Sequence, residues 1–286
     1  KSFVDQGTIA GAVTLAARHG VVASLEAVGY QDLENKRPMR TDSIFEIMSM
    51  TKPVTAAGTM LLMEEGRLAL SDPVEKHLPE FRGLWVIDSP GEKERRLKRP
   101  SRAITIRDLP THTSGMPELP PEGGKYSTAS DLYAFYQMMA NGGTYNKRRV
   151  FSRGSVELMT AVHTAELKQS WGLGWSVVRD PAGTLQLESA GTFGHGGAFG
   201  TYGWIDPRKD LIGVLLIQRW GGGDCRVGKS DRRGRLSYLP RTIGTNITGM
   251  TLRRRILPSA VLSTTIRSWP KIVPPTGATS LPPGLS

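Results

Sequence analysis

The sequence predicts a mixed α/β domain in which strands lie near both ends and helices lie between them. Near the start, apolar runs on either side of the turn Arg18-His19-Gly20 are typical of a β-hairpin. Further along, the segments "WGLGWSVVR", "FGHGGAFGTYGWIDP" and "LIGVLLIQRW" predict three successive strands, and the Asp206-Pro207 turn joins the last two as a second hairpin. Between these strand regions, apolar residues recur at helical spacing.

The first predicted helix follows a short extended segment, residues 44–49. Gly66 is a natural C-cap for this helix, and Pro53 is tolerated because it lies in the first turn. The apolar positions that recur at helical spacing are Val54, Ala57, Leu61 and Leu62.

More helices are predicted in the middle of the chain. Asp72 is the expected N-cap of a short helix with Pro73 at its first position. Residues 104–109 indicate a strand or the start of a helix. The strongest helical pattern covers residues 127–143, with Ser130 as its cap. Its apolar stripe consists of Leu132, Phe135, Met138 and Met139. A last helix is predicted over residues 152–160.

Length and composition indicate a soluble globular protein with a sizeable core. The chain has 286 residues, 38% hydrophobic and 22% charged, enough for one large domain or two small ones. No apolar run approaches the roughly 20 residues that a membrane-spanning helix needs, so we expect no membrane span. The single cysteine, Cys225, excludes an internal disulfide. None of the five histidines has another histidine or a cysteine at metal-ligand spacing, so we expect no metal and no cofactor.

The net charge of +11 is concentrated toward the C-terminal end. From Asp224 onward there are 11 Lys and Arg against 2 Asp and Glu, a net of +9, whereas residues 1–223 carry 26 against 24, a net of +2. This distribution argues against a specific nucleic-acid partner for the main body of the chain. Residues 224–286 also lack glutamate and are rich in Arg and Pro. We therefore expect a domain over residues 1–223, followed by a mostly disordered basic tail.

The segment "SMTK" places Ser49 three residues before Lys52 at the start of the first predicted helix. Residues i and i+3 share a helix face, so the amine can sit beside the hydroxyl. A lysine held neutral by burial and nearby positive charge can take the hydroxyl proton and make the serine a nucleophile. The spacing alone is weak, because Ser268 and Lys271 repeat it in the Pro-rich tail. A helix N-cap is the simpler explanation of Ser49 by itself.

Four segments taken together are more specific than this spacing. They are "FEIMSMTKPVTAAGTMLLMEEGRLALSDPVEKHLPEF", "THTSGMPEL", "GGKYSTASDLYAFYQMMANGG" and "FGHGGAFGTYGWIDPRKDLIGVLLIQR", in this order. They resemble the serine β-lactamase-related family, most closely its class C-like branch with esterases and D-alanyl-D-alanine peptidases. The resemblance covers most of residues 1–220. It implies an antiparallel sheet flanked by helices, and substrates that are small esters, amides or β-lactams.

The resemblance also implies roles for individual residues. Ser49 corresponds to the acylated nucleophile and Lys52 to its proton partner. His195-Gly196-Gly197 corresponds to the third motif, on the strand that edges the cleft, and the backbone N–H of Ala198 would join that of Ser49 as an oxyanion hole. The "HTSG" segment that begins at His112 corresponds to a structural landmark of the family, so neither His112 nor Ser114 is expected to act in catalysis.

The chain departs from the family pattern in one respect that bears on activity. The family's second motif, Tyr-x-Asn, is absent from the sequence. Either this motif and much of a helical lobe are deleted between residues 119 and 121, or "KYST" is a degenerate version with Tyr126 as its tyrosine and Thr128 in place of the asparagine. We favour the deletion, because "GGKYSTASDL" matches the next landmark of the family without strain.

These observations lead to one expected function and one alternative. We expect a serine hydrolase that forms an acyl-enzyme, with esterase-like rather than amidase activity, because an amide demands better protonation of the leaving group. The alternative is a catalytically impaired or inactive member that lacks the second motif.

Overall fold

A computed structural model describes residues 2–87, 97–116, 124–183 and 188–219. Both the expected tail, residues 224–286, and the expected deletion point between residues 119 and 121 lie outside the described residues. In the described part of the chain, no helix is long and apolar enough to cross a membrane.

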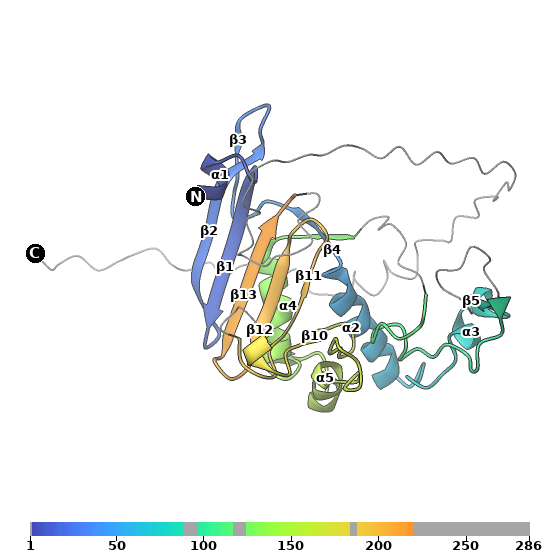
Figure 1. The fold of residues 1–286 in the computed structure, drawn as a ribbon. Helices are drawn as coiled ribbons and strands as arrows, with labels where there is room; N and C mark the ends of the chain where they lie inside the picture. The colour runs from blue at the N-terminus through green and yellow to red at the C-terminus, as the bar shows by residue number, and fades with distance from the viewer. Residues whose placement is uncertain (1, 88–96, 117–123, 184–187, 220–286) are drawn as a thin grey trace, which may run out of the picture. The chain divides into compact units, whose positions relative to one another are not determined.

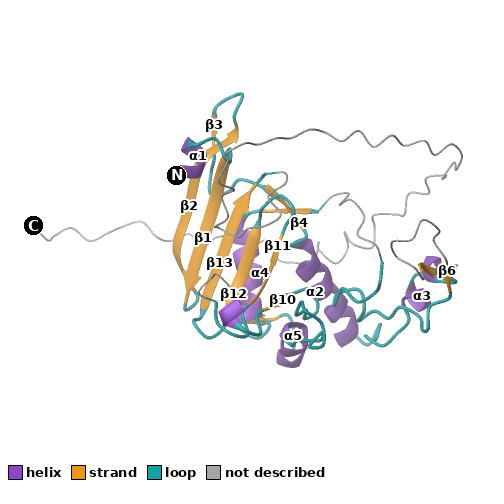
Figure 2. Ribbon diagram, in the orientation of Figure 1, coloured by secondary structure: helices purple, strands orange, loops and turns teal. Residues whose placement is uncertain are grey.

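A seven-stranded antiparallel sheet forms the centre of the domain (Figure 1 and Figure 2). Its order is β10-β11-β12-β13-β1-β2-β3, so β1 pairs with β13, the last strand of the described residues. The strands are β1 (Gly11–Arg18), β2 (Val21–Asp32), β3 (Arg37–Pro38), β10 (Ser176–Val177), β11 (Phe193–Gly196), β12 (Tyr202–Asp206) and β13 (Leu211–Ile217). Both predicted hairpins are confirmed, since β1 pairs with β2 and β12 with β13.

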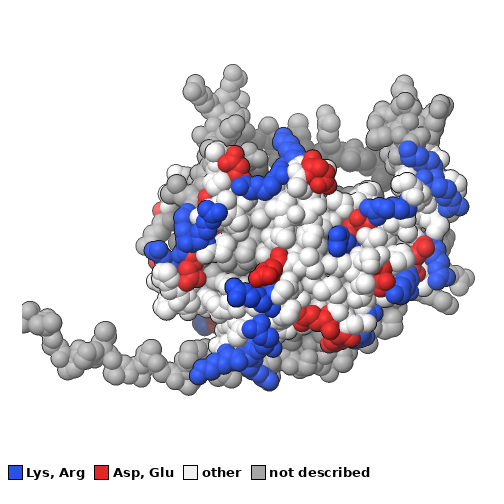
Figure 3. All heavy atoms as spheres, turned by 90° about the horizontal axis from the view of Figure 1, so that it is seen from below, with Lys and Arg blue, Asp and Glu red and all other residues white. Residues whose placement is uncertain are grey.

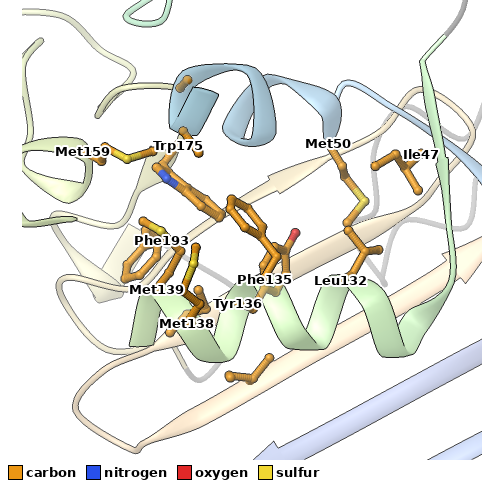
Figure 4. Close-up of a cluster of buried hydrophobic side chains, with 14 of the residues drawn as sticks. Ile47, Met50, Leu132, Phe135, Tyr136, Met138, Met139, Met159, Trp175 and Phe193 are labelled. Carbon is orange, nitrogen blue, oxygen red and sulfur yellow. The ribbon is translucent and has the colours of Figure 1, made fainter. Parts of the chain in front are cut away.

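The central strands show the period of two that a sheet with one buried face requires. In β13 alternate residues are buried, among them Val214 and Leu216, and in β1 Val13 and Leu15 face the same core. Helix α4 (Ala129–Ala140) packs on this face against β13 and β1. Its stripe of Leu132, Phe135, Met138 and Met139 is buried as predicted. Figure 4 shows Phe135, Met138 and Met139 on the side of Trp175 and Phe193, and Leu132 beside Met50.

Helix α2 (Thr51–Glu64) follows strand β4 (Phe45–Met48), as predicted. Gly66 has the left-handed conformation expected after a helix C-terminus, with φ of 68°. The buried face is rotated slightly from the prediction: Ala57 is buried as expected, but Val54 and Leu61 are only partly buried. The fully buried residues of α2 are Pro53, Ala56, Ala57 and Met60.

The remaining elements are short. The helices are α1 (Ser2–Asp5), α3 (Val74–His77), η1 (Pro79–Phe81), α5 (Arg153–Thr160) and η2 (Pro181–Gly183). Three two-stranded ladders pair β4 with β7 (Lys125–Ser127), β5 (Val86–Ile87) with β6 (Leu97–Lys98), and β8 (Thr144–Tyr145) with β9 (Arg148–Arg149).

Three strand predictions were wrong in detail. Residues 193–206 form two strands, β11 and β12, because the turn after Gly197 reverses the chain. Most of residues 171–179 is loop, with β10 covering two residues. Residues 104–109 form turns, in which Thr105 makes only an isolated bridge to Pro73.

Two predicted helix caps were also wrong. Thr128, not Ser130, caps α4, because its side chain accepts a hydrogen bond from the Asp131 N–H. Asp72 does not cap α3; its carboxylate instead accepts hydrogen bonds from the Ala69 N–H and the Lys76 ammonium group. The cap of α5 at Ser152 does use the side-chain hydroxyl, which accepts from the N–H of Ser155.

Candidate active site

Ser49 and Lys52 lie in contact at the point where β4 turns into α2. The Lys52 Nζ is 2.6 Å from the Ser49 Oγ, a short hydrogen bond. The turn is made by Met48, which has a left-handed φ of 48° although it is not glycine. Such a conformation costs of the order of 1–3 kcal/mol and persists only where the surroundings enforce it. The predicted pairing of hydroxyl and amine is thus present in the geometry.

Two glycines enclose this turn from segments far away in the sequence. A Cβ atom on Gly124 would lie 2.6 Å from the Met48 Cα, and the Gly124 N–H donates to Glu46 Oε1 at 3.2 Å. On the other side, a Cβ on Gly174 would lie 2.9 Å from the Lys52 carbonyl oxygen. Gly174 also has a φ of 77°, which favours glycine. Only residues without a side chain fit at these two positions.

Strand β11 brings the predicted third motif against the same turn. A Cβ on Gly197 would lie 2.5 Å from the Ile47 carbonyl oxygen, and the Thr201 Oγ1 donates to that oxygen at 3.3 Å. The backbone after Gly197 therefore runs directly beside the end of β4. Among the described residues, neither the N–H of Ser49 nor that of Ala198 has a hydrogen-bond acceptor. Both groups are available to stabilise a developing negative charge.

His195, the first residue of the third motif, is buried with 8% of its surface exposed. Its Nδ1 lies 2.7 Å from the Gly196 carbonyl oxygen. A carbonyl oxygen can only accept, so Nδ1 carries the proton and Nε2 has a free lone pair. The pKa of His195 is lowered to about 4, mainly by burial; the Gly196 hydrogen bond opposes this shift, and the charges of Lys52 and His112 add to it. At neutral pH the ring is uncharged.

Because His195 is uncharged, the positive charge expected near Lys52 does not come from this histidine. The sequence suggested a buried lysine near positive charge, but Lys52 is exposed in the described structure and His195 adds no charge beside it at pH 7. The short contact with Ser49 is the feature that links Lys52 to proton transfer.

Aromatic rings cover His195 on the side of the "HTSG" segment. The rings of His112 and Trp171 lie 4.1 Å apart, and the Trp171 ring lies 5.6 Å from that of His195. His112 itself has a left-handed φ of 58°. Trp171 therefore forms a wall beside the site, whereas Trp175 is fully buried in the core.

Tyr126 is not brought to the Ser49 hydroxyl. It lies in β7 opposite Glu46, and 68% of its surface is exposed. Among the described residues, its hydroxyl makes no hydrogen bond. The structure thus brings together Ser49, Lys52 and the turn that follows β11, and leaves Tyr126 outside this group.

The comparison of the sequence with known families identifies the family of the chain. The profile of the family described as Beta-lactamase matches residues 1–125 and 120–236. The chain belongs to the beta-lactamase family. Its resemblance to serine β-lactamase-related proteins, expected from four segments, is confirmed, and a serine hydrolase is the type of enzyme that the family and its relatives indicate.

The relatives of this beta-lactamase family member include proteins with different names. Protein Rv1367c of Mycobacterium tuberculosis is 27% identical over 352 aligned positions, which cover 76% of this chain and 88% of the relative. Esterase EstB of Burkholderia gladioli is 40% identical over 108 residues, 38% of this chain and 25% of the esterase. Penicillin-binding protein 4* of Bacillus subtilis is 38% identical over 104 residues, 36% of this chain and 19% of that protein.

Solved structures confirm the fold. EstCE1, a hydrolase with promiscuous acyltransferase activity, aligns with a TM-score of 0.63 and 18% identity over 78% of this chain and 92% of its own. The penicillin-binding protein homologue from Pyrococcus abyssi aligns with a TM-score of 0.57 and 17% identity, over 76% of this chain and 71% of its own. The predicted antiparallel sheet with flanking helices is therefore correct.

The sequence did not single out Met48, Gly124 or Gly174, although they shape the turn at Ser49. A methionine has no preference for left-handed backbone that would have identified the first. The two glycines belong to the segments "GGKYSTA" and "WGLGW", and their contacts with the turn arise only in the folded chain.

Proposed function

We propose that this protein is a serine hydrolase that forms an acyl-enzyme on Ser49 and acts on small esters. The observation that carries the proposal is the 2.6 Å contact between the Lys52 amine and the Ser49 hydroxyl at the start of α2. A nucleophile within hydrogen-bonding distance of a base is the arrangement that covalent catalysis requires.

The proposed reaction has two steps. The Ser49 Oγ attacks the ester carbonyl carbon while the unprotonated form of the Lys52 amine takes the hydroxyl proton, and the alcohol leaves with that proton returned by Lys52. Water then attacks the acyl-enzyme, releases the carboxylic acid and restores the serine. The N–H groups of Ser49 and Ala198 would hold the oxyanion in both steps, each contributing about 10²–10³-fold to the rate.

We infer that the second motif and part of the helical lobe are missing. The alignment to the mycobacterial relative extends over 352 positions although this chain has 286 residues, so the relative contains a long stretch without a counterpart here. The family profile matches in two segments that meet at residues 120–125. A groove of about 670 Å³ is lined in part by exposed apolar residues, among them Trp85 and Met116. The loss of a lobe that covered this groove would leave such residues exposed.

An ester suits this site better than an amide, because an alkoxide is a better leaving group and depends less on a positioned acid. The similarity to an esterase over 108 residues supports this choice of substrate class. Charge supports a small molecule rather than nucleic acid as the substrate. Figure 3 shows basic and acidic side chains interspersed over one face of the described residues.

The test is intact-mass spectrometry after incubation with a reactive p-nitrophenyl alkylphosphonate. Attack by the Ser49 Oγ forms an O–P bond and expels p-nitrophenolate, so wild type should gain one phosphonyl adduct and Ser49→Ala none. Lys52→Met should react at least about 10²-fold more slowly, because the proton acceptor is gone.

Ser114→Ala is the matched control. It removes another serine of the four segments that resemble the family, and it should react as wild type does. An adduct that persists in Ser49→Ala, or no adduct on a folded wild type, would refute the proposal.

The second candidate is a family member that binds acyl ligands without turning them over. The position of Tyr126, exposed and outside the group around Ser49, favours it, because no hydroxyl then takes the place of the tyrosine of the missing second motif. Turnover of p-nitrophenyl acetate decides between the two: one equivalent of p-nitrophenol or none supports the second candidate, and repeated turnover supports the first. A tenfold loss of turnover in Tyr126→Phe would show instead that "KYST" is a working second motif.

A further inference from the structure

Tyr136 of α4 carries a buried hydroxyl that the proposed reaction does not use. Its side chain is 1% exposed, and its hydroxyl has no hydrogen-bond partner among the described residues. The hydroxyl lies against Gly203 of β12, where a Cβ atom would collide with it. An unsatisfied buried hydroxyl costs about 1–3 kcal/mol, so a residue of this kind calls for a physical reason.

His195 carries the complementary group on the same face of the sheet. His195 is the register partner of Gly203 in the antiparallel β11–β12 pair, and residues directly opposite one another share a face. The Cβ positions of such partners are about 5 Å apart, which places the Tyr136 hydroxyl within roughly 8 Å of the His195 Cβ. The Nε2 of His195 is buried and, like the hydroxyl, lacks a partner among the described residues.

The His195 Nε2 atom and the Tyr136 hydroxyl are an acceptor and a donor, as a hydrogen-bonded link requires. The His195 Nε2 can only accept, because Nδ1 donates to Gly196. The Tyr136 hydroxyl stays protonated and can donate, since burial raises its pKa well above the usual range. Figure 4 shows this hydroxyl pointing from α4 toward α2, while the Trp175 indole nitrogen lies at the far end of its ring. Trp175 is thus not the partner.

We propose that Tyr136 is a positioning residue for His195, connected to it through one buried water molecule. A direct hydrogen bond is absent, and a single water that accepts from the tyrosine and donates to Nε2 satisfies both groups at once. Gly203 provides the room for this link, because any side chain there would displace the hydroxyl.

The link would act on the proposed reaction, on which this part of the inference rests. A donor at Nε2 holds His195 in the Nδ1–H form, and Nδ1 in turn fixes the Gly196 carbonyl, two residues before the Ala198 N–H. The charged or titratable groups that face His195 are Lys52 of α2 and His112 of the "HTSG" segment, and Tyr202 of β12 lies near Tyr136. None of these three replaces the donor at Nε2.

The experiment combines a readout of the histidine with a readout of the reaction. Nitrogen NMR of ¹⁵N-histidine-labelled full-length protein, with His195 assigned by its loss in His195→Gln, reports its tautomer and its titration. In Tyr136→Phe we expect the pKa of His195 to rise by about half a unit to one unit, because the neutral ring loses a hydrogen bond of ordinary strength. The rate of phosphonylation should fall about 3- to 10-fold.

Tyr133→Phe is the matched control on the same helix. Its half-buried hydroxyl donates to the Gly20 carbonyl at 2.9 Å, away from the site, so neither readout should change. An unchanged or lowered His195 pKa in a folded Tyr136→Phe protein would overturn the inference, as would an Nε2–H tautomer in wild type. Gly203→Ala should raise the pKa of His195 as Tyr136→Phe does, because the new methyl group would displace the Tyr136 hydroxyl. The NMR readout does not need activity, so it stands even if Ser49 is never acylated.

Discussion

His195 couples the stability of the domain to pH, because its ring is buried in the neutral form. Its pKa is lowered to about 4 in the folded chain, against about 6.5 for an unfolded histidine. Between these values the unfolded chain binds a proton that the folded chain does not, so stability falls as the pH decreases from 6.5 to 4. The expected loss is about 3 kcal/mol relative to a variant that cannot titrate at this position.

Urea unfolding of wild type and His195→Gln at several pH values measures this difference. The variant should lose less stability than wild type over the same pH window. Parallel pH profiles for wild type and His195→Gln would show that the ring is not buried in its neutral form.

The site could be predicted at the level of residues only where the signal is local. Ser49 and Lys52 were found because their i, i+3 spacing is a local signal and because the segment that contains them resembles the family. The left-handed Met48 and the close approach of Gly174 depend on contacts between segments that are far apart in the sequence, and no local pattern encodes them. The neutrality of His195 is likewise a product of burial, which the sequence does not specify.

The junction between β11 and β4 is the element contact on which the oxyanion site depends. In Gly197→Ala the new methyl group would meet the Ile47 carbonyl and the Thr201 hydroxyl, and the backbone at Ile47 cannot give way as a flexible side chain could. The strand end should move away from Ser49 and carry the Ala198 N–H with it. We expect phosphonylation to slow by about 10²-fold, the usual effect of losing one such donor.

Gly58→Ala is the control for this glycine substitution. Gly58 lies inside α2, and nothing lies within 4 Å of the position of its Cβ. The variant should keep the wild-type rate and gain about 0.5–1 kcal/mol of stability, because alanine is the better helix former. A wild-type rate in Gly197→Ala would mean that the Ala198 N–H does not take part.

Elements with strong periodicity were predicted well, and elements held by tertiary contacts were not. Helix α4 was found with its buried stripe, and β1, β2 and β13 with their hairpins. Residues 104–109 have the apolar content of a strand, but their backbone bonds to the loop before α3 rather than to a sheet. The sequence predicted one strand in the glycine-rich segment after residue 193, where the chain in fact reverses direction. Glycine is compatible with both strand ends and turns, so the turn could not be located.

At the scale of the whole molecule, the antiparallel sheet with flanking helices was expected from the resemblance to the family and is confirmed by the solved structures. The sequence pattern by itself predicted strands at both ends of the domain but not that they pair. Hydrophobic periodicity carries no information about which strand lies beside which.

The pairing of β1 with β13 also has a consequence for how the chain is made. Strand β1 is synthesised about 200 residues before its partner β13. Ribosomes add about 5–20 residues each second, so the nascent β1–β2 hairpin lacks β13 for about 10–40 s. During this interval the open edge of β1 can pair with other chains, and for most of it the turn that carries Ala198 has not yet been synthesised. Slower synthesis lengthens the time during which this edge can pair with another chain before its own partner is made.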